Sequence, residues 1–248
     1  MDSFAISRTG YKKRVNEDSF GGTVSADGLV KFLVVSDGMG GHLAGDVASR
    51  MTVDGICAAA SKYTYGGVEH LREFLTETVV SVDSDITKHA ADDILCKNMG
   101  ATLVLLAVIE SENNAVVCNV GDSRCYHFDG GRLLQVTRDH SVAQLMIEKG
   151  YTPEETRKYL FNNAVTKAMG FLAKIGCTEP DCYEVEHKRG DIFLLCSDGL
   201  SAAVDPVELY SVISDNSGKR MDRMCEALVY TALGCGSEDD ITVAVVKM

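Results

Sequence analysis

The chain has 248 residues, with 24 Lys and Arg against 36 Asp and Glu, so its formal net charge is −12 when histidine is neutral. A surplus of negative charge repels nucleic acids and anionic membrane surfaces, which argues against both as partners. The content of 46% hydrophobic and 24% charged residues is typical of a globular protein. No linker or repeat divides the sequence, so we expect a single catalytic domain over residues 1–248.

The predicted elements begin with strands at 3–7 and 31–36, followed by amphipathic helices through 44–56 and 68–86, where apolar residues recur at helical spacing. A block of strands follows at 102–109, 115–120, 124–128 and 132–136, and Gly130 and Gly131 allow an antiparallel hairpin between the last two. Capping residues before proline predict helices that start after Thr152 and after Asp205, on either side of a strand at 191–197. A helix at about 221–233 and a strand at 241–246 complete the chain. Because strands and helices are segregated, the pattern predicts an α+β fold with largely antiparallel sheets covered by helices.

The apolar runs are short, and the longest of them, such as 102–109, cannot span a bilayer. The first ten residues contain no hydrophobic signal region, so we expect a cytoplasmic protein. The nine cysteines are irregularly spaced, and Cys118, Cys125 and Cys196 lie inside apolar runs, as reduced and buried thiols do. We therefore expect no disulfides.

Several aspartates stand beside glycine or at the end of an apolar run. They are Asp18, Asp37, Asp122, Asp198, Asp239 and Asp240. One Asp-Gly pair would only mark a turn, but the same SDG tripeptide ends two separate runs, at 36–38 and at 197–199. If these strand ends meet, ionised carboxylates would repel one another unless their pKa values rise or hard cations bind them. Without comparable His or Cys spacings, Mg²⁺ or Mn²⁺ is favoured over Zn²⁺.

The ordered strings NED, VVSDGMGGH, MGATLV, NVGDSR, DHS, LLCSDGL and GSEDDITV resemble the motif series of the type 2C metal-dependent Ser/Thr protein phosphatases (the PPM family), in particular its compact bacterial members. The resemblance extends from about Ser7 to Val246. It implies a four-layer α-β-β-α sandwich with two mainly antiparallel sheets, and two Mn²⁺ or Mg²⁺ ions bridged by a hydroxide that hydrolyses phosphoserine and phosphothreonine. It also implies phosphorylated protein partners, among them a Ser/Thr kinase and its substrates. We expect a monomer.

Carried over by position, the resemblance assigns metal ligation to Asp18, Asp37, the Gly38 carbonyl, Asp198 and Asp239, with Asp37 bridging both ions. Glu17 would hold metal-bound water. Asp240 stands where the family usually has asparagine, and it either strengthens the attraction for metal or caps the following strand. Because no covalent phosphoenzyme is needed, the buried cysteines require no nucleophilic role.

Other positions depart from the family pattern. Lys13 occupies the place of the usual phosphate-binding arginine, and Arg14 is the next residue, so either could hold phosphate. Leu95 stands where many bacterial members have an aspartate for a third metal, with Asp92 and Asp93 just before it, so a third metal lacks its usual ligand. The flap region around 150–170 carries an unusual segment at 159–163, which indicates a different substrate preference.

Three further polar residues have open roles. His42 could donate a proton to the leaving group or brace its loop. Asp122 could reach the metals, although a structural role, such as pairing with Arg124, is favoured. His140 is expected in the first turn of a helix.

Two other functions compete with a broad phosphatase. One is a pseudophosphatase or regulatory binding module, and such proteins lose metal aspartates, whereas Asp37, Asp198 and Asp239 are all present. The other is a phosphatase dedicated to a single regulator of stress or sporulation. The sequence does not separate this alternative from a broad enzyme.

Overall fold

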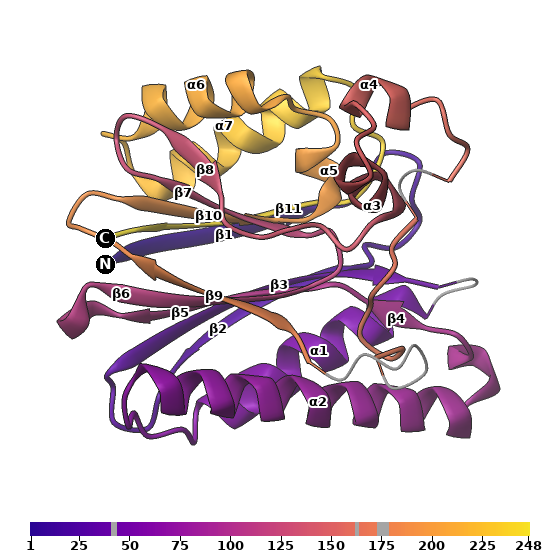
Figure 1. The fold of residues 1–248 in the computed structure, drawn as a ribbon, viewed down its shortest axis with the longest axis horizontal. Helices are drawn as coiled ribbons and strands as arrows, with labels where there is room; N and C mark the ends of the chain where they lie inside the picture. Colours follow the sequence, from indigo (N-terminus) through magenta and orange to yellow (C-terminus); the bar gives the residue numbers. More distant parts are fainter. Residues whose placement is uncertain (41–43, 162–163, 173–178) are drawn as a thin grey trace.

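The computed structural model describes residues 1–40, 44–161, 164–172 and 179–248, and its strands form two sheets (Figure 1). The first sheet has the order β1 (Asp2–Arg8), β11 (Ile241–Lys247), β10 (Ile192–Cys196), β7 (Arg124–Phe128) and β8 (Leu133–Gln135). The second has the order β2 (Asp18–Val24), β3 (Val30–Met39), β5 (Leu103–Ile109), β6 (Asn114–Val120) and β9 (Asp181–Glu186), and β4 (Gly100–Ala101) pairs with the end of β3. These strand pairs are all antiparallel.

Helices cover the outer faces of both sheets. The second sheet is covered by α1 (Gly45–Ala60) and α2 (Val68–Asp92), and the first by α6 (Pro206–Asn216) and α7 (Met221–Gly234) (Figure 1). The short helices α3 (Val142–Glu148), α4 (Pro153–Thr156) and α5 (Asp198–Ser201) lie in connections at the end of the sandwich away from the two termini. The predicted four-layer α-β-β-α arrangement is therefore confirmed.

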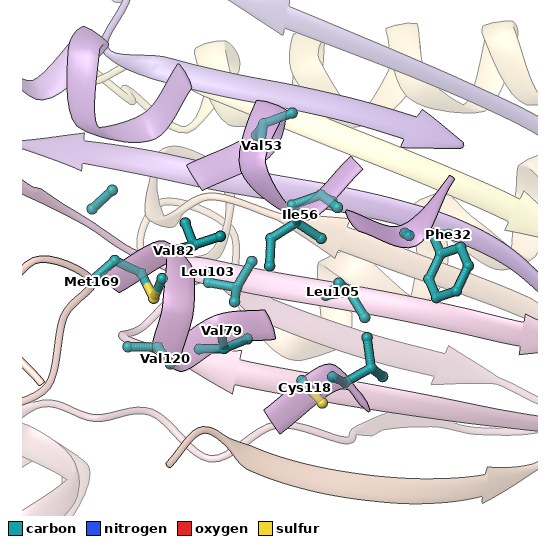
Figure 2. Packing of buried hydrophobic residues seen from close by; sticks show 14 of the residues in the cluster. Phe32, Val53, Ile56, Val79, Val82, Leu103, Leu105, Cys118, Val120 and Met169 are labelled. Atoms are coloured by element: carbon teal, nitrogen blue, oxygen red, sulfur yellow. The ribbon is translucent and has the colours of Figure 1, made fainter. Parts of the chain in front are cut away.

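Apolar side chains fill each of the three spaces between layers. Figure 2 shows Ile56 of α1, Val79 of α2 and Leu105 of β5 in the core beneath the second sheet. The next residue, Leu106, points the other way and packs with Phe193 of β10 between the two sheets. Because β5 is buried on both faces, its sequence is a continuous apolar run without polar alternation.

Most predicted elements are present, and the differences have physical reasons. Strand β2 escaped prediction because its glycines weaken the strand signal. A Cβ at Gly21 would come within 2.6 Å of Val53, so this glycine allows α1 to approach the sheet closely. Strand β9 was also missed, since it lies at a sheet edge and carries polar residues. The helix predicted after Thr152 has its capping box, but α4 is only 4 residues long.

The prediction that no disulfide forms is wrong. Cys118 of β6 and Cys182 of β9 are directly opposite in the strand register and are joined by a disulfide, with their Cα atoms 4.3 Å apart. This pair was not predictable from the sequence, because Cys182 lies in β9, the edge strand that was not predicted. Cys125 and Cys196 are free and fully buried, as expected.

The ends of β3 and β10 and the starts of β2 and β11 lie at the same end of the sandwich, opposite the chain termini (Figure 1). This end carries the aspartates that the sequence singled out. None of the described helices is long and apolar enough to cross a membrane.

Candidate metal centre

Four carboxylates converge at this end of the sandwich, and we call Asp18, Asp37, Asp198 and Asp239 the carboxylate cluster. Asp18 and Asp37 are cross-strand partners on β2 and β3, so their side chains lie on the same face of the sheet. Asp198 is the first residue of α5, directly after β10 and Ser197, and Asp239 lies two residues before β11. The turns after β10 and before β11 therefore bring acids from distant parts of the sequence to one place.

Burial and mutual repulsion raise the pKa values of Asp18, Asp37 and Asp198. Burial, with smaller contributions from Asp240 and Asp198, raises the pKa of Asp18 to about 7. The pKa of Asp37 is raised well above its ordinary value by burial and then by the charges of Asp18, Asp198 and Asp122. The pKa of Asp198 is also raised, by burial and by the charge of Asp239. Such shifts mark carboxylates that are held close together away from water.

Thr102 fixes the backbone at Asp37 from both sides. The Asp37 amide donates to the Thr102 hydroxyl at 2.9 Å, and the Thr102 amide donates to the Asp37 carbonyl at 2.8 Å. The hydroxyls of Thr102 and Ser123 are 2.6 Å apart. The MGATLV and NVGDSR strings therefore share a structural task, which is to hold Asp37 at the end of β3.

A chain of hydroxyl groups positions Asp18. The Ser197 hydroxyl donates to Asp18 Oδ2 at 2.8 Å and accepts from the Thr242 amide at 3.0 Å. The Thr242 hydroxyl in turn donates to Ser7 Oγ at 2.7 Å, and Asn16 donates to the same oxygen. The sequence reasoning missed Ser197, although its repeated place in the two SDG tripeptides was a signal.

Asp240 anchors the loop between β1 and β2, residues 9–17. Its side chain is 2% exposed and accepts from the Gly10 amide with Oδ1 and from the Glu17 amide with Oδ2, both at 2.8 Å. Both oxygens are thus engaged with backbone, and Asp240 holds the loop rather than capping its own strand. An asparagine side chain could accept only one of these two bonds.

Lys13 lies among the acids, whereas Arg14 does not. Lys13 Nζ is 2.8 Å from Asp239 Oδ1 and 3.1 Å from Glu17 Oε2. Although burial alone would lower it, the pKa of Lys13 is raised by hydrogen bonds to these two carboxylates. Arg14 is exposed, and it lines a small hollow of about 120 Å³ together with Lys13, Glu17 and Asp46. The structure therefore favours Lys13 as the cation closest to the carboxylate cluster.

Gly38 and Gly45 allow the start of α1 to pack against the end of β3. A Cβ on Gly38 would lie 2.0 Å from the Gly45 carbonyl oxygen, and one on Gly45 would lie 2.6 Å from Glu17 Oε1. Any larger residue would push the helix away from the cluster. Gly38 of the VVSDGMGGH string and Gly45 of α1 are thus required by close packing at this site.

The carboxylate cluster fits divalent cations. Among the described residues, Asp18 Oδ1 and Asp198 Oδ1 are buried oxygens without a hydrogen-bond partner. An unpaired buried carboxylate oxygen is costly unless a proton or a cation neutralises it. The donors are oxygens from carboxylates, the ligand type preferred by Mg²⁺ and Mn²⁺.

The structure corrects two expectations about residues near the carboxylate cluster. Arg124 does not form the expected pair with Asp122, because its guanidinium donates to Asp139 at 2.6 to 3.1 Å. Burial, and then the charges of Asp198 and Asp139, raise the pKa of Asp122 to about 7. His140 lies just before Ser141, the N-cap of α3, and so it is outside the helical turn in which it was expected.

Three other predictions concern His42, the flap segment at 159–163 and Leu95. His42, the possible general acid, lies outside the described residues, as do residues 162 and 163 of the unusual flap segment. The described part of that segment exposes Leu160 and Phe161 by 89% and 72%, so it offers apolar surface to solvent. Leu95 is exposed and cannot replace a carboxylate ligand.

A two-sheet sandwich that gathers carboxylates with unpaired oxygens at its strand ends defines a metal-dependent hydrolase. The protein phosphatase 2C family model matches residues 9–231. Serine/threonine phosphatase stp of Listeria monocytogenes is 33% identical over 235 residues, which cover 94% of this chain and 90% of that protein.

Solved structures agree with this match. The S. agalactiae serine/threonine phosphatase has a TM-score of 0.91 at 26% identity, and the match covers 100% of this chain and 99% of that one. The catalytic domain of the phosphatase PstP, solved in complex with two manganese ions, has a TM-score of 0.83 at 28% identity, with 99% and 96% coverage. The chain belongs to the protein phosphatase 2C family, and the predicted resemblance and enzyme class, a phosphoprotein phosphatase, are confirmed.

Proposed function

We propose that this protein removes phosphate from phosphoserine and phosphothreonine in other proteins, using two Mn²⁺ or Mg²⁺ ions held by the carboxylate cluster. The observation that carries the proposal is the pair of buried, unpartnered oxygens on Asp18 and Asp198, of which Asp198 lines an open groove. The groove has a volume of about 630 Å³, and Lys13, Asp198 and Asp239 line it. A phosphorylated side chain entering the groove would meet the cluster directly.

Each residue has a separate task in this proposal. The four aspartates of the cluster, with the Gly38 carbonyl, would hold the two cations, and Glu17 would orient bound water. When bound, two divalent ions lower the pKa of a water that they share and neutralise the phosphoryl oxygens. Lys13 would swing from its carboxylate partners to a phosphoryl oxygen, contributing one charged hydrogen bond.

Asp122 and Asp240 support the site from its edges. Asp122 adds a fifth negative charge to the four of the carboxylate cluster, which increases the attraction for cations. Asp240 lies too deep to meet substrate and instead keeps Lys13 and Glu17 in place through the backbone of their loop. It acts as a positioning residue.

The biological setting follows from the same activity. The partners would be phosphorylated proteins, including a Ser/Thr kinase and its substrates, and the protein would act as a cytoplasmic monomer that does not bind nucleic acid or membranes. Residues 1–248 would form one catalytic domain, because β1 and β11 from the two chain ends pair along their whole length. The binding-module alternative is not favoured, since the cluster retains its aspartates.

Phosphate release from a phosphothreonine peptide tests the proposal. Wild type should be active with Mn²⁺ and inactive with excess EDTA, and Asp198→Asn should lose nearly all activity because it removes a predicted ligand. Asp85→Asn makes the same chemical change on the exposed surface of α2 and serves as the matched control. Equal Mn²⁺-dependent rates for Asp198→Asn and wild type would refute the proposed site.

A further inference from the structure

A second group of potential metal ligands, which shares no residue with the carboxylate cluster, lies at the C-terminal end of α2. It consists of His89, Asp93 and Cys96, and we call it the His-Asp-Cys group. One ligand atom from each residue, an imidazole nitrogen, a carboxylate oxygen and the sulfur, lies within 4.8 Å of the other two. These atoms are close enough for one ion to reach all three after small side-chain rotations.

Local backbone structure brings the three residues together. His89 and Asp93 are four residues apart at the end of α2, so they lie on the same side of the last turn. The Asp93 amide donates to the His89 carbonyl, and the Cys96 amide donates to the Asp93 carbonyl, both at 3.0 Å. The Asp93 side chain also accepts from the Leu95 amide at 2.9 Å. The backbone is therefore fixed before any ligand binds.

The sulfur is sheltered while the imidazole is accessible. Cys96 is 6% exposed and contacts the core beneath the second sheet, whereas His89 is exposed. Burial raises the pKa of the Cys96 thiol, and the carboxylates of Asp93 and Asp46 add to this effect. Negative charge around a buried thiol opposes a free thiolate but favours a thiolate neutralised by a cation.

We propose that the His-Asp-Cys group is a separate binding site for a thiophilic divalent cation of the Zn²⁺ or Co²⁺ type. Sulfur and imidazole ligands select these ions over Mg²⁺ and Mn²⁺, which prefer the all-oxygen cluster. Binding displaces the Cys96 proton to solvent and forms one bond from the sulfur to the metal. Three protein ligands leave one position of a tetrahedral ion for water.

Titration of the full-length, EDTA-treated and desalted protein with Co²⁺ tests the proposal. A cysteine ligand produces a thiolate-to-cobalt charge-transfer absorption that carboxylate ligands do not. One such band per chain is expected, and Cys96→Ser should abolish it. The control Cys235→Ser removes an exposed free thiol and should leave the band unchanged. Asp198→Asn should also leave it unchanged, so the result does not depend on the proposed phosphatase centre.

Because Cys96 is buried, Cys96→Ser could fail to fold, and a second variant keeps the test informative in that case. His89→Gln changes an exposed residue and should weaken Co²⁺ binding at least about tenfold, as a lost ligand does. Absence of the band in wild type would overturn the proposal. So would a band that persists in Cys96→Ser, or an affinity that His89→Gln leaves unchanged.

Discussion

Lys13→Ala should impair catalysis much more than Arg14→Ala. Lys13 Nζ is held among the acids by Asp239 and Glu17, at 2.8 and 3.1 Å, and it lines the groove next to the cluster. Arg14 is exposed and does not line that groove, although it shares a smaller hollow with Lys13 and Glu17. Lys13 and Arg14 therefore differ in their access to the groove, and the sequence alone could not show which of them lies there.

The size of the effect follows from one charged contact. A hydrogen bond to a charged group contributes about 1.5–3 kcal/mol. If Lys13 makes this bond to a phosphoryl oxygen, its loss should lower kcat/KM by roughly 10- to 150-fold. Lys13→Arg keeps the charge and adds a second donor, so it should remain within about tenfold of wild type.

Steady-state hydrolysis of a phosphothreonine peptide at saturating Mn²⁺ measures these effects. Arg14→Ala is the matched control, because it removes the same charge one residue away. The reasoning fails if Arg14→Ala lowers kcat/KM more than Lys13→Ala does. Equal and small losses from both would show that phosphate binding relies on the metals alone.

Three further changes probe the loop, the cluster and the disulfide. Asp240→Asn leaves either the Gly10 or the Glu17 amide without its acceptor, which should cost about 1–3 kcal/mol of stability in urea unfolding; an unchanged midpoint would contradict the loop anchor. In EDTA, the raised pKa of Asp18 means that the folded state keeps a proton that the unfolded chain has released, so stability should fall as pH rises from about 4 to about 7. Calorimetry at pH 5 and pH 8 checks the sign, and greater metal-free stability at pH 8 would oppose it. Reduction of the disulfide, which spans 64 residues, should lower stability by up to about 4 kcal/mol, and alkylation of Cys182 without reductant would disprove the bond.

The fold was largely predictable because most of its strands are buried and strongly apolar. This is why the apolar runs stand out that form five of the strands, β3, β5, β6, β10 and β11. The order of the predicted elements also excluded a strict alternation of strands and helices. Strand β2 did not stand out because its glycines allow close packing of a helix. Strand β9 did not stand out because it lies at the edge of the sheet and carries polar residues. Local sequence carries little information about such tertiary requirements.

The site, like the fold, was predictable only in part. Repeated aspartates beside glycine identified Asp37 and Asp198 from the sequence, because their context was unusual. The partners of each acid were not predictable, since they depend on which strands become neighbours. Arg124 pairs with Asp139 rather than with the nearer Asp122, and Asp240 binds the backbone of a loop more than 220 residues away in the sequence.

Anomalous X-ray scattering from crystals soaked in Mn²⁺ tests the central claim most directly. The account predicts two manganese ions at the carboxylate cluster, with oxygens of Asp37, Asp198 and Asp239 at coordination distances of about 2.0–2.3 Å. Crystals of Asp37→Asn should lose at least one of them. The claim would be contradicted if no manganese bound among these carboxylates, or if the ions occupied the cluster equally in Asp37→Asn.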